Sequence, residues 1–139
     1  MSVVDLGHSY LTDVLELDLK MPLNYREARS ALQSLLSATP VLGIPSDDVD
    51  GTLRPLPDGG GTALIVFDSV PGGAGYVRLI REELEQVLAG AQKIVRGCEC
   101  AEDASCYACL RTYRNQAHHD DLVRGDALRI LDSLLAHES

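Results

Sequence analysis

The first half of the chain shows a strand pattern followed by a helix pattern. Apolar and polar residues alternate from Thr12 to Lys20, which predicts a half-buried strand. Asn24 and Glu27 have the spacing of a helical capping box, and apolar residues then recur every three or four positions. This pattern predicts a helix from Tyr25 to Ala38, which ends before Pro40 because proline disfavours helical backbone in the preceding residue.

Two more strands are expected in the middle of the chain. Alternation from Asp48 to Arg54 indicates an exposed or edge strand, and the glycines of 58–61 supply a turn. The segment from Thr62 to Asp68 is almost wholly apolar and rich in β-branched residues, which is typical of a strand covered on both faces. We therefore place this last strand at the centre of the sheet.

Helical spacing returns in the second half of the chain. It predicts one helix from Gly75 to Val95 that covers a face of the sheet, and a closing helix from Leu122 to Leu135 in which Gly125 sets a break or a start. With 139 residues, the chain is expected to form a single domain over 1–139. Its predicted class is α+β, with three to four antiparallel or mixed strands covered by helices.

Hydropathy and charge limit where the chain works and what it binds. The longest apolar run, Ala63 to Phe67, is too short to cross a membrane, and the start of the chain lacks a secretion signal, so we expect a cytoplasmic location. The net charge is −9, whereas nucleic-acid binding depends on Lys and Arg at phosphates. An acidic chain that contacts DNA needs a local basic patch or a basic partner.

Four cysteines carry the most specific signal in the sequence. Cys98, Cys100, Cys106 and Cys109 form a CxC pair, a spacer of five residues and a CxxC pair. Two close pairs of thiolates can supply the tetrahedral sulfur ligands that zinc prefers, and four sulfurs leave no open position for water. The pattern predicts one structural zinc ion in a knuckle over 97–116, before the C-terminal helix. Four thiolates and one divalent zinc would take the net charge to −11.

Disulfides and an iron–sulfur cluster are two other uses of these cysteines. A disulfide is disfavoured because a CxC pair closes a strained ring and no secretion signal is present. An iron–sulfur cluster uses the same four thiolates, so spacing alone leaves it as an alternative. For the zinc site, Gly97 would relieve strain at the turn, and Arg96, Arg111 and Arg114 are close enough in sequence to offset the charge of the thiolates.

Four tracts in order give the chain a family resemblance. They are Leu6–His8 with Thr12–Val14, Asp68–Tyr76, Cys106–Gln116, and the later residues His119, Leu122 and Arg124. Together they resemble the MrfA-like zinc-binding family, found at the C-terminus of DEAD/DEAH-box helicases. The resemblance implies a domain that works beside a helicase motor, in cis or in trans, in DNA repair or in antiphage defence of the DISARM type.

The resemblance also implies that the chain is not itself an enzyme. The sequence agrees, because a nucleotide-binding P-loop needs GxxxxGK[ST] and neither Lys20 nor Lys93 follows a glycine-rich loop. Family members are usually the tail of a much longer protein. The chain is therefore either a short companion subunit or part of a longer helicase.

The glycines before the predicted second helix are a candidate anion site. Gly72, Gly73 and Gly75 lie between a strand and a helix, where free backbone N–H groups can hold a phosphate. The alternative is that glycine only permits a tight turn, with Asp68 capping the helix.

Aromatic and basic residues after the third cysteine are a candidate contact for single-stranded DNA. They are Tyr107, Arg111, Tyr113, Arg114 and His118. Bases stack on aromatic rings while arginines meet phosphates. In the competing interpretation, the tyrosines cover the metal and the core, the arginines neutralise thiolates, and the chain is an interaction subunit that does not touch DNA.

A third hypothesis, beside the helicase accessory domain and the interaction subunit, is a metal-dependent nuclease. His118, His119, Asp120 and Asp121 form a short His/Asp run, but two-metal hydrolysis needs several convergent acids or imidazoles. Asp48, Asp50 and Asp68 would have to converge in the fold. We expect instead that Asp120 or Asp121 caps the last helix.

Overall fold

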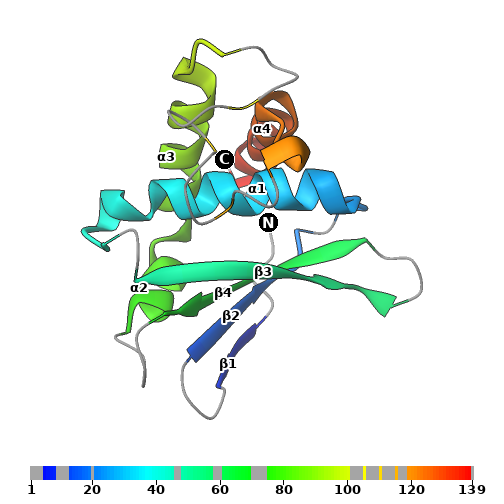
Figure 1. Ribbon diagram of the computed structural model, residues 1–139. Coiled ribbons are helices and arrows are strands. Elements are labelled where there is room, and N and C mark those ends of the chain that lie inside the picture. The colour runs from blue at the N-terminus through cyan, green and yellow to red at the C-terminus, as the bar shows by residue number, and fades with distance from the viewer. Residues whose placement is uncertain are drawn as a thin grey trace.

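The computed structural model arranges the chain in three layers (Figure 1). It describes residues 5–8, 13–19, 21–45, 48–57, 61–69, 75–100, 105, 110, 115 and 119–138. The strands of this part are β1 (Asp5–His8), β2 (Asp13–Leu17), β3 (Val49–Pro55) and β4 (Thr62–Asp68). Its helices are α1 (Tyr25–Ala38), the short 3-10 helix η1 (Thr39–Leu42), α2 (Tyr76–Glu82), α3 (Leu84–Gly97) and α4 (Arg124–Glu138). The α+β class is confirmed.

The strands form one antiparallel sheet in the order β1-β2-β4-β3. Strand β4 is internal and β3 is at an edge, as the sequence predicts. The pairs Leu15↔Val66 and Leu17↔Leu64 place the buried side chains of β2 and β4 on one face. On the opposite face, Ile65 is only half-buried, so β4 is not fully covered on both sides as expected.

Helix α1 lies directly on the buried face of the sheet. A Cβ atom added to Gly51 of β3 would lie 2.7 Å from the Leu32 side chain of α1 and 2.8 Å from the Ile65 carbonyl oxygen. Such distances are shorter than side chains tolerate, so glycine at this position is what permits the close approach of helix and strand.

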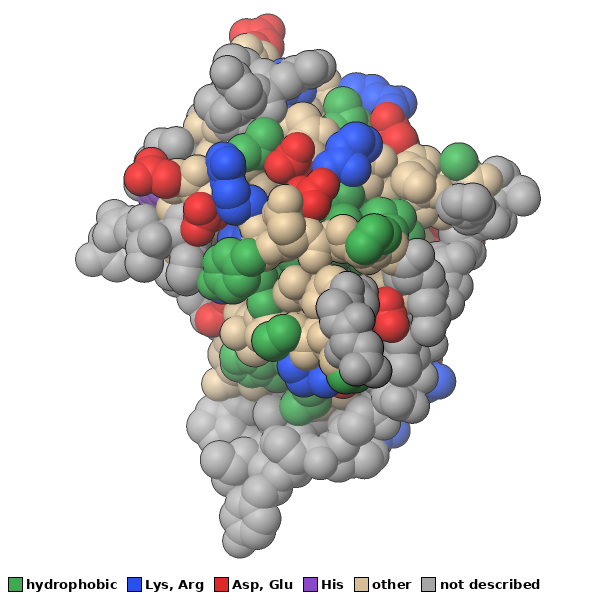
Figure 2. Space-filling view, turned by 90° about the vertical axis from the view of Figure 1, so that its right-hand side faces the viewer, with side chains coloured by type: hydrophobic (Ala, Val, Ile, Leu, Met, Phe, Trp, Pro, Cys, Tyr) green, Lys and Arg blue, Asp and Glu red, His purple; other side chains and the backbone are tan. Residues whose placement is uncertain are grey.

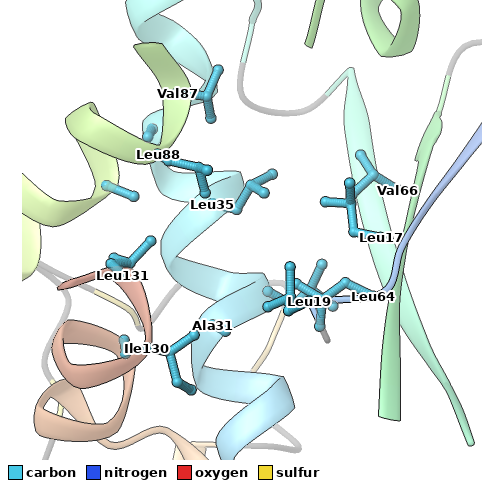
Figure 3. Packing of buried hydrophobic residues seen from close by; sticks show 14 of the residues in the cluster. Leu17, Leu19, Ala31, Leu35, Leu64, Val66, Val87, Leu88, Ile130 and Leu131 are labelled. Carbon is cyan, nitrogen blue, oxygen red and sulfur yellow. The ribbon is translucent and has the colours of Figure 1, made fainter. Parts of the chain in front are cut away.

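The third layer consists of α3 and α4, which pack on the other side of α1. In Figure 3, Leu35 of α1 lies between Leu17 and Val66 of the sheet and Leu88 of α3, and Ala31 lies near Ile130 of α4. The core is therefore continuous through α1, which has apolar neighbours on two opposite sides.

The expectation of a single helix from Gly75 to Val95 is wrong, although the first part of this segment does pack on the sheet. The helix is interrupted at Glu83, which separates α2 from α3. Helix α2 packs against β2 and β4, whereas α3 packs against α1 and α4. A straight helix cannot reach both layers. The face of the sheet is covered by α1, which packs on β3 and β4, together with α2, which packs on β2 and β4.

The beginning of α1 is held by a reciprocal capping box. The Glu27 amide donates to Asn24 Oδ1 at 2.8 Å, and the Asn24 amide donates to Glu27 Oε1 at 3.0 Å. Arg129 of α4 also donates to the Glu27 carboxylate and forms an ion pair with it. Glu27 thus caps one helix and joins it to another.

This arrangement predicts a pH dependence of stability. The hydrogen bond from the Asn24 amide, and then the hydrogen bond and charge of Arg129, lower the pKa of Glu27 from its ordinary value of 4.5. Its contribution to stability is thus present above that value and is lost as the pH falls through the lower folded-state pKa. Glu27→Gln is expected to be less stable than wild type at about pH 7, with a difference that shrinks at about pH 3, measured by urea unfolding. A difference equal at both pH values would contradict this role.

Candidate metal centre

The first cysteine pair follows the end of α3. Helix α3 ends at Gly97, and Cys98 has extended backbone, with φ −76° and ψ 142°. Side chains two positions apart on extended backbone point to the same side, so Cys98 and Cys100 meet while Glu99 between them is exposed. Their Sγ atoms are 3.6 Å apart, and both residues are half-buried.

The separation of these two sulfurs fits a shared zinc ion. Ligands about 2.3 Å from a tetrahedral zinc lie roughly 3.8 Å from each other. The sulfurs are much further apart than in a disulfide, whose bond is about 2.05 Å long. A soft thiolate pair at this spacing therefore matches half of a four-sulfur zinc site. The second pair, Cys106 and Cys109, lies outside the described residues.

Three single residues of the cysteine segment are described, and all are buried. Ser105 and Asn115 are nearly inaccessible, and Leu110 belongs to the hydrophobic core. The Asn115 side-chain amide donates to the Leu110 carbonyl oxygen at 2.9 Å. Leu110 is thus anchored in the core, and Asn115 is bonded to it.

The far end of the segment is tied to α1 through a buried serine. Ser30 Oγ accepts the Val123 amide at 2.8 Å and donates to the Asp121 carbonyl oxygen at 3.2 Å. Ser30 itself is fully buried. The chain therefore enters α4 at a fixed position.

Arg124 connects the two ends of the segment. Its side chain is buried; Nη1 donates to the Val95 carbonyl oxygen at 2.8 Å and Nη2 to the Cys100 carbonyl oxygen at 2.6 Å. Arg124 is predicted to matter only through the family resemblance, and Ser30 is not among the predicted site residues. No sequence signal marks either role, since both depend on long-range contacts.

Arg96, expected to offset the charge of the thiolates, is engaged elsewhere. Its Nη2 lies 2.6 Å from the Asp132 carboxylate of α4, and its side chain is largely exposed. The described arginine that reaches the cysteine pair is Arg124, on the following helix. Arg111 and Arg114 lie outside the described part.

The residues of the candidate DNA contact are also outside the described part. The contact consists of Tyr107, Arg111, Tyr113, Arg114 and His118. Their role stays a prediction.

The candidate anion loop is described only at its last glycine. Gly75 precedes α2 and has φ +80°, a conformation that favours glycine, and it makes no side-chain cap. Gly75 occupies the cap position of α2, so Asp68 is not its N-cap residue, and a contact of its carboxylate with the start of α2 stays a prediction. Gly72 and Gly73 lie outside the described residues, so an anion contact stays a prediction.

The acids proposed for a nuclease do not converge. Val49 pairs with Asp68 and Asp50 pairs with Phe67, so the alternation of the strands puts Asp50 and Asp68 on opposite faces of the sheet. Within the described ranges, no group of three or more His, Cys, Asp or Glu residues is placed to hold a metal. This constellation is therefore not assembled.

The aspartates expected to cap α4 do not occupy its cap position, and Asp121 contacts α1 instead. Helix α4 begins at Arg124, which makes Val123 the residue before it. The Asp121 carboxylate lies 3.9 Å from Arg26 Nε of α1, and its carbonyl oxygen accepts from Ser30. The expectation that Asp120 or Asp121 caps the helix is wrong.

Comparison with known proteins places the chain in a family. The family model described as the MrfA Zn-binding domain matches residues 28–110, a stretch that includes all four cysteines. The chain belongs to the MrfA Zn-binding domain family, which makes it a zinc-binding domain.

Two relatives match the chain over only part of their own length. It is 30% identical over 134 residues to the Druantia protein DruE of Escherichia coli, a match that covers 81% of the chain and 7% of DruE. It is 26% identical over 73 residues to an uncharacterized protein of Methanocaldococcus jannaschii, covering 52% of the chain and 63% of that protein. The chain thus spans less than two thirds of either relative.

Solved structures share the fold. The helicase MrfA bound to DNA matches with a TM-score of 0.61 at 18% identity, over 88% of this chain and 17% of MrfA. MrfA bound to DNA and AMPPNP matches with a TM-score of 0.58 at 18% identity, over 77% of this chain and 14% of MrfA. None of the helices described for the present chain is long and apolar enough to span a membrane.

Proposed function

We propose that the chain is a zinc-stabilised accessory domain that works beside a DEAD/DEAH-box helicase motor, in cis or in trans, in DNA repair or antiphage defence. In this proposal, Cys98, Cys100, Cys106 and Cys109 hold one structural zinc ion, and any ATPase activity resides on the motor. The observation that carries it is the CxC pair, whose sulfurs are 3.6 Å apart in a chain of the MrfA Zn-binding domain family.

A set of four cysteine ligands fits a structural ion better than a catalytic one. Four sulfur ligands fill the tetrahedron, so no water is bound for activation. The metal would stabilise the fold as apolar packing does elsewhere, since it would cross-link the end of α3 to the segment that leads into α4. Both MrfA structures are of a helicase bound to DNA, which supports a place for such a domain beside a motor.

Contact with single-stranded DNA is the finer part of the proposal. Tyr107 and Tyr113 would stack on bases, while Arg111 and Arg114 would meet phosphates, with His118 beside them. These residues follow the first cysteine of the CxxC pair, so the zinc would fix the segment that carries them.

The surface elsewhere favours a second candidate function, a subunit that binds the motor and no DNA. The net charge is −9, and several described arginines are in ion pairs: Arg54 with Glu16, Arg96 with Asp132, and Arg129 with Glu27. On the face in Figure 2, the described Lys and Arg side chains lie among Asp and Glu side chains and form no continuous basic surface.

Titration of a labelled single-stranded oligonucleotide separates the two functions. The zinc-loaded chain, alone and with a helicase motor, is expected to bind it more weakly as salt increases. Arg111→Ala with Arg114→Ala removes two phosphate contacts, which should make the slope of log affinity against log salt shallower by about 1.4. The matched control, Arg54→Ala with Arg129→Ala, removes two ion-paired arginines and should leave that slope unchanged. Absence of binding at low salt in both settings would contradict DNA contact and favour the interaction subunit.

A further inference from the structure

Arg124 is unusual because it is a buried cation whose hydrogen bonds go to main-chain oxygens. It is 8% exposed, and its two terminal nitrogens donate to the carbonyls of Val95 and Cys100. Val95 belongs to the last turn of α3, three positions before Cys98. Cys100 is itself one of the predicted metal ligands. One guanidinium thus connects the backbone on both sides of the CxC turn.

The charge of Arg124 is not balanced within the described part of the chain. No carboxylate there forms an ion pair with it, and its Nε is buried without a hydrogen-bond acceptor. Burial of a cation is costly unless an opposite charge or hydrogen bonds compensate it. Zinc with four thiolates carries a net charge of −2, so a metal centre on Cys100 would supply the opposite charge beside the guanidinium.

The backbone next to Arg124 is also held in place. Ser30 of α1 holds Val123 through its amide, one residue before Arg124. The side chain therefore extends from an anchored helix start to the turn that carries the first two sulfurs. Arginine suits this geometry because its planar fork has several donors, whereas lysine has a single nitrogen.

We propose that Arg124 is a positioning residue of the zinc centre. Its guanidinium fixes the Val95 and Cys100 carbonyls, keeps the Cys98 and Cys100 sulfurs at ligand spacing, and offsets the charge of the thiolates. The inference rests on the proposed function, in which the four cysteines hold zinc. It adds a residue from α4 that couples the metal to the packing of the helical layer.

The test is a zinc competition against a chromophoric chelator, on the full chain. Arg124→Lys keeps the charge but loses the fork, and Arg124→Met loses both. Both variants are expected to bind zinc about 10- to 100-fold more weakly than wild type, as when partners that orient metal ligands are removed. Arg129→Met, an exposed arginine on the same helix, is the surface control and should stay within about twofold.

Leu35→Ala separates positioning from general stability. It removes core packing far from the cysteines in sequence, so it should lower stability while zinc affinity stays within about threefold of wild type. In the Arg124 variants, alkylation of Cys98 and Cys100 in the zinc-loaded protein should accelerate as affinity falls. If Arg124→Met does not fold, the affinity and alkylation rate of Arg124→Lys decide.

The outcomes distinguish this inference from the proposed function. A wild-type chain that binds no zinc would overturn both. A wild-type chain that binds zinc, with Arg124→Lys and Arg124→Met within about twofold of it, would overturn the role of Arg124 and leave the zinc site standing. An equal loss of affinity in Leu35→Ala would also overturn it, because the effect would then follow stability alone.

Discussion

Removal of zinc is expected to lower the thermal midpoint of unfolding by more than about 10 °C, because binding free energy on the order of 10 kcal/mol becomes folding free energy in a small metal site. The segment over 97–116 should lose its structure first. Helix α4 follows this segment and is joined to it by Arg124, so its packing on α1 and α3 should also loosen. Circular dichroism melting with and without a strong chelator measures the shift, and amide hydrogen exchange locates it.

The control for this prediction is the double variant Cys98→Ser with Cys100→Ser. It should melt near the midpoint of the chelated wild type and should not respond to the chelator. Amides at the beginning of α4 should exchange faster after chelation, while those of β4, in the middle of the sheet, change less. An unchanged midpoint in wild type would contradict a structural metal.

Truncation of Leu35 is expected to destabilise the chain by about 2–5 kcal/mol, the cost of a buried leucine replaced by alanine. Leu35 is 1% exposed and lies on α1, the layer that contacts both the sheet and the α3–α4 pair. A cavity here would weaken both contacts of the central helix. Urea unfolding of Leu35→Ala at constant zinc measures the effect.

Val41 provides the matched control for Leu35. It follows α1 in η1 and is 52% exposed, so Val41→Ala should change the free energy of unfolding by less than about 0.5 kcal/mol. A cost below about 1 kcal/mol for Leu35→Ala would mean that α1 does not form the centre of the core.

Local signals in the sequence predicted those parts of the fold that depend on neighbouring residues. The capping box of Asn24 and Glu27, with the proline after the helix, predicted α1 from Tyr25 to Ala38, the bounds that the structure shows. The apolar run from Thr62 to Asp68 predicted an internal strand, because such a run suits a strand with neighbours on both edges. Gly125 was expected to set a break or a start, and α4 begins one residue earlier.

Features that depend on tertiary packing were not predicted. Strand β1 has only four residues, and its sequence, DLGH, lacks a clear alternation, so its pairing with β2 gave no signal. The segment over 75–95 has a helical pattern throughout, yet it forms two helices, α2 and α3, that pack on different layers. Periodicity identifies an apolar side of a helix but does not say which layer it meets.

In the candidate site too, contacts between residues close in sequence were predicted, and contacts that depend on tertiary packing were not. The spacing of Cys98 and Cys100 predicted two neighbouring thiols, and the sulfurs lie 3.6 Å apart. The expectation that Arg96 serves the thiolates came from its closeness in sequence, but its position on α3 directs it to Asp132. Arg124 is 24 residues from Cys100, and only the packing of α4 beside α3 brings it to the turn.

The central claim is tested most directly by the metal content of the purified chain, measured by mass spectrometry under native and denaturing conditions, with the optical spectrum. The account predicts one zinc ion per chain in a colourless protein, released on denaturation and absent when Cys98, Cys100, Cys106 and Cys109 are replaced by serine. A chain without metal, or a coloured one that contains iron, would contradict it.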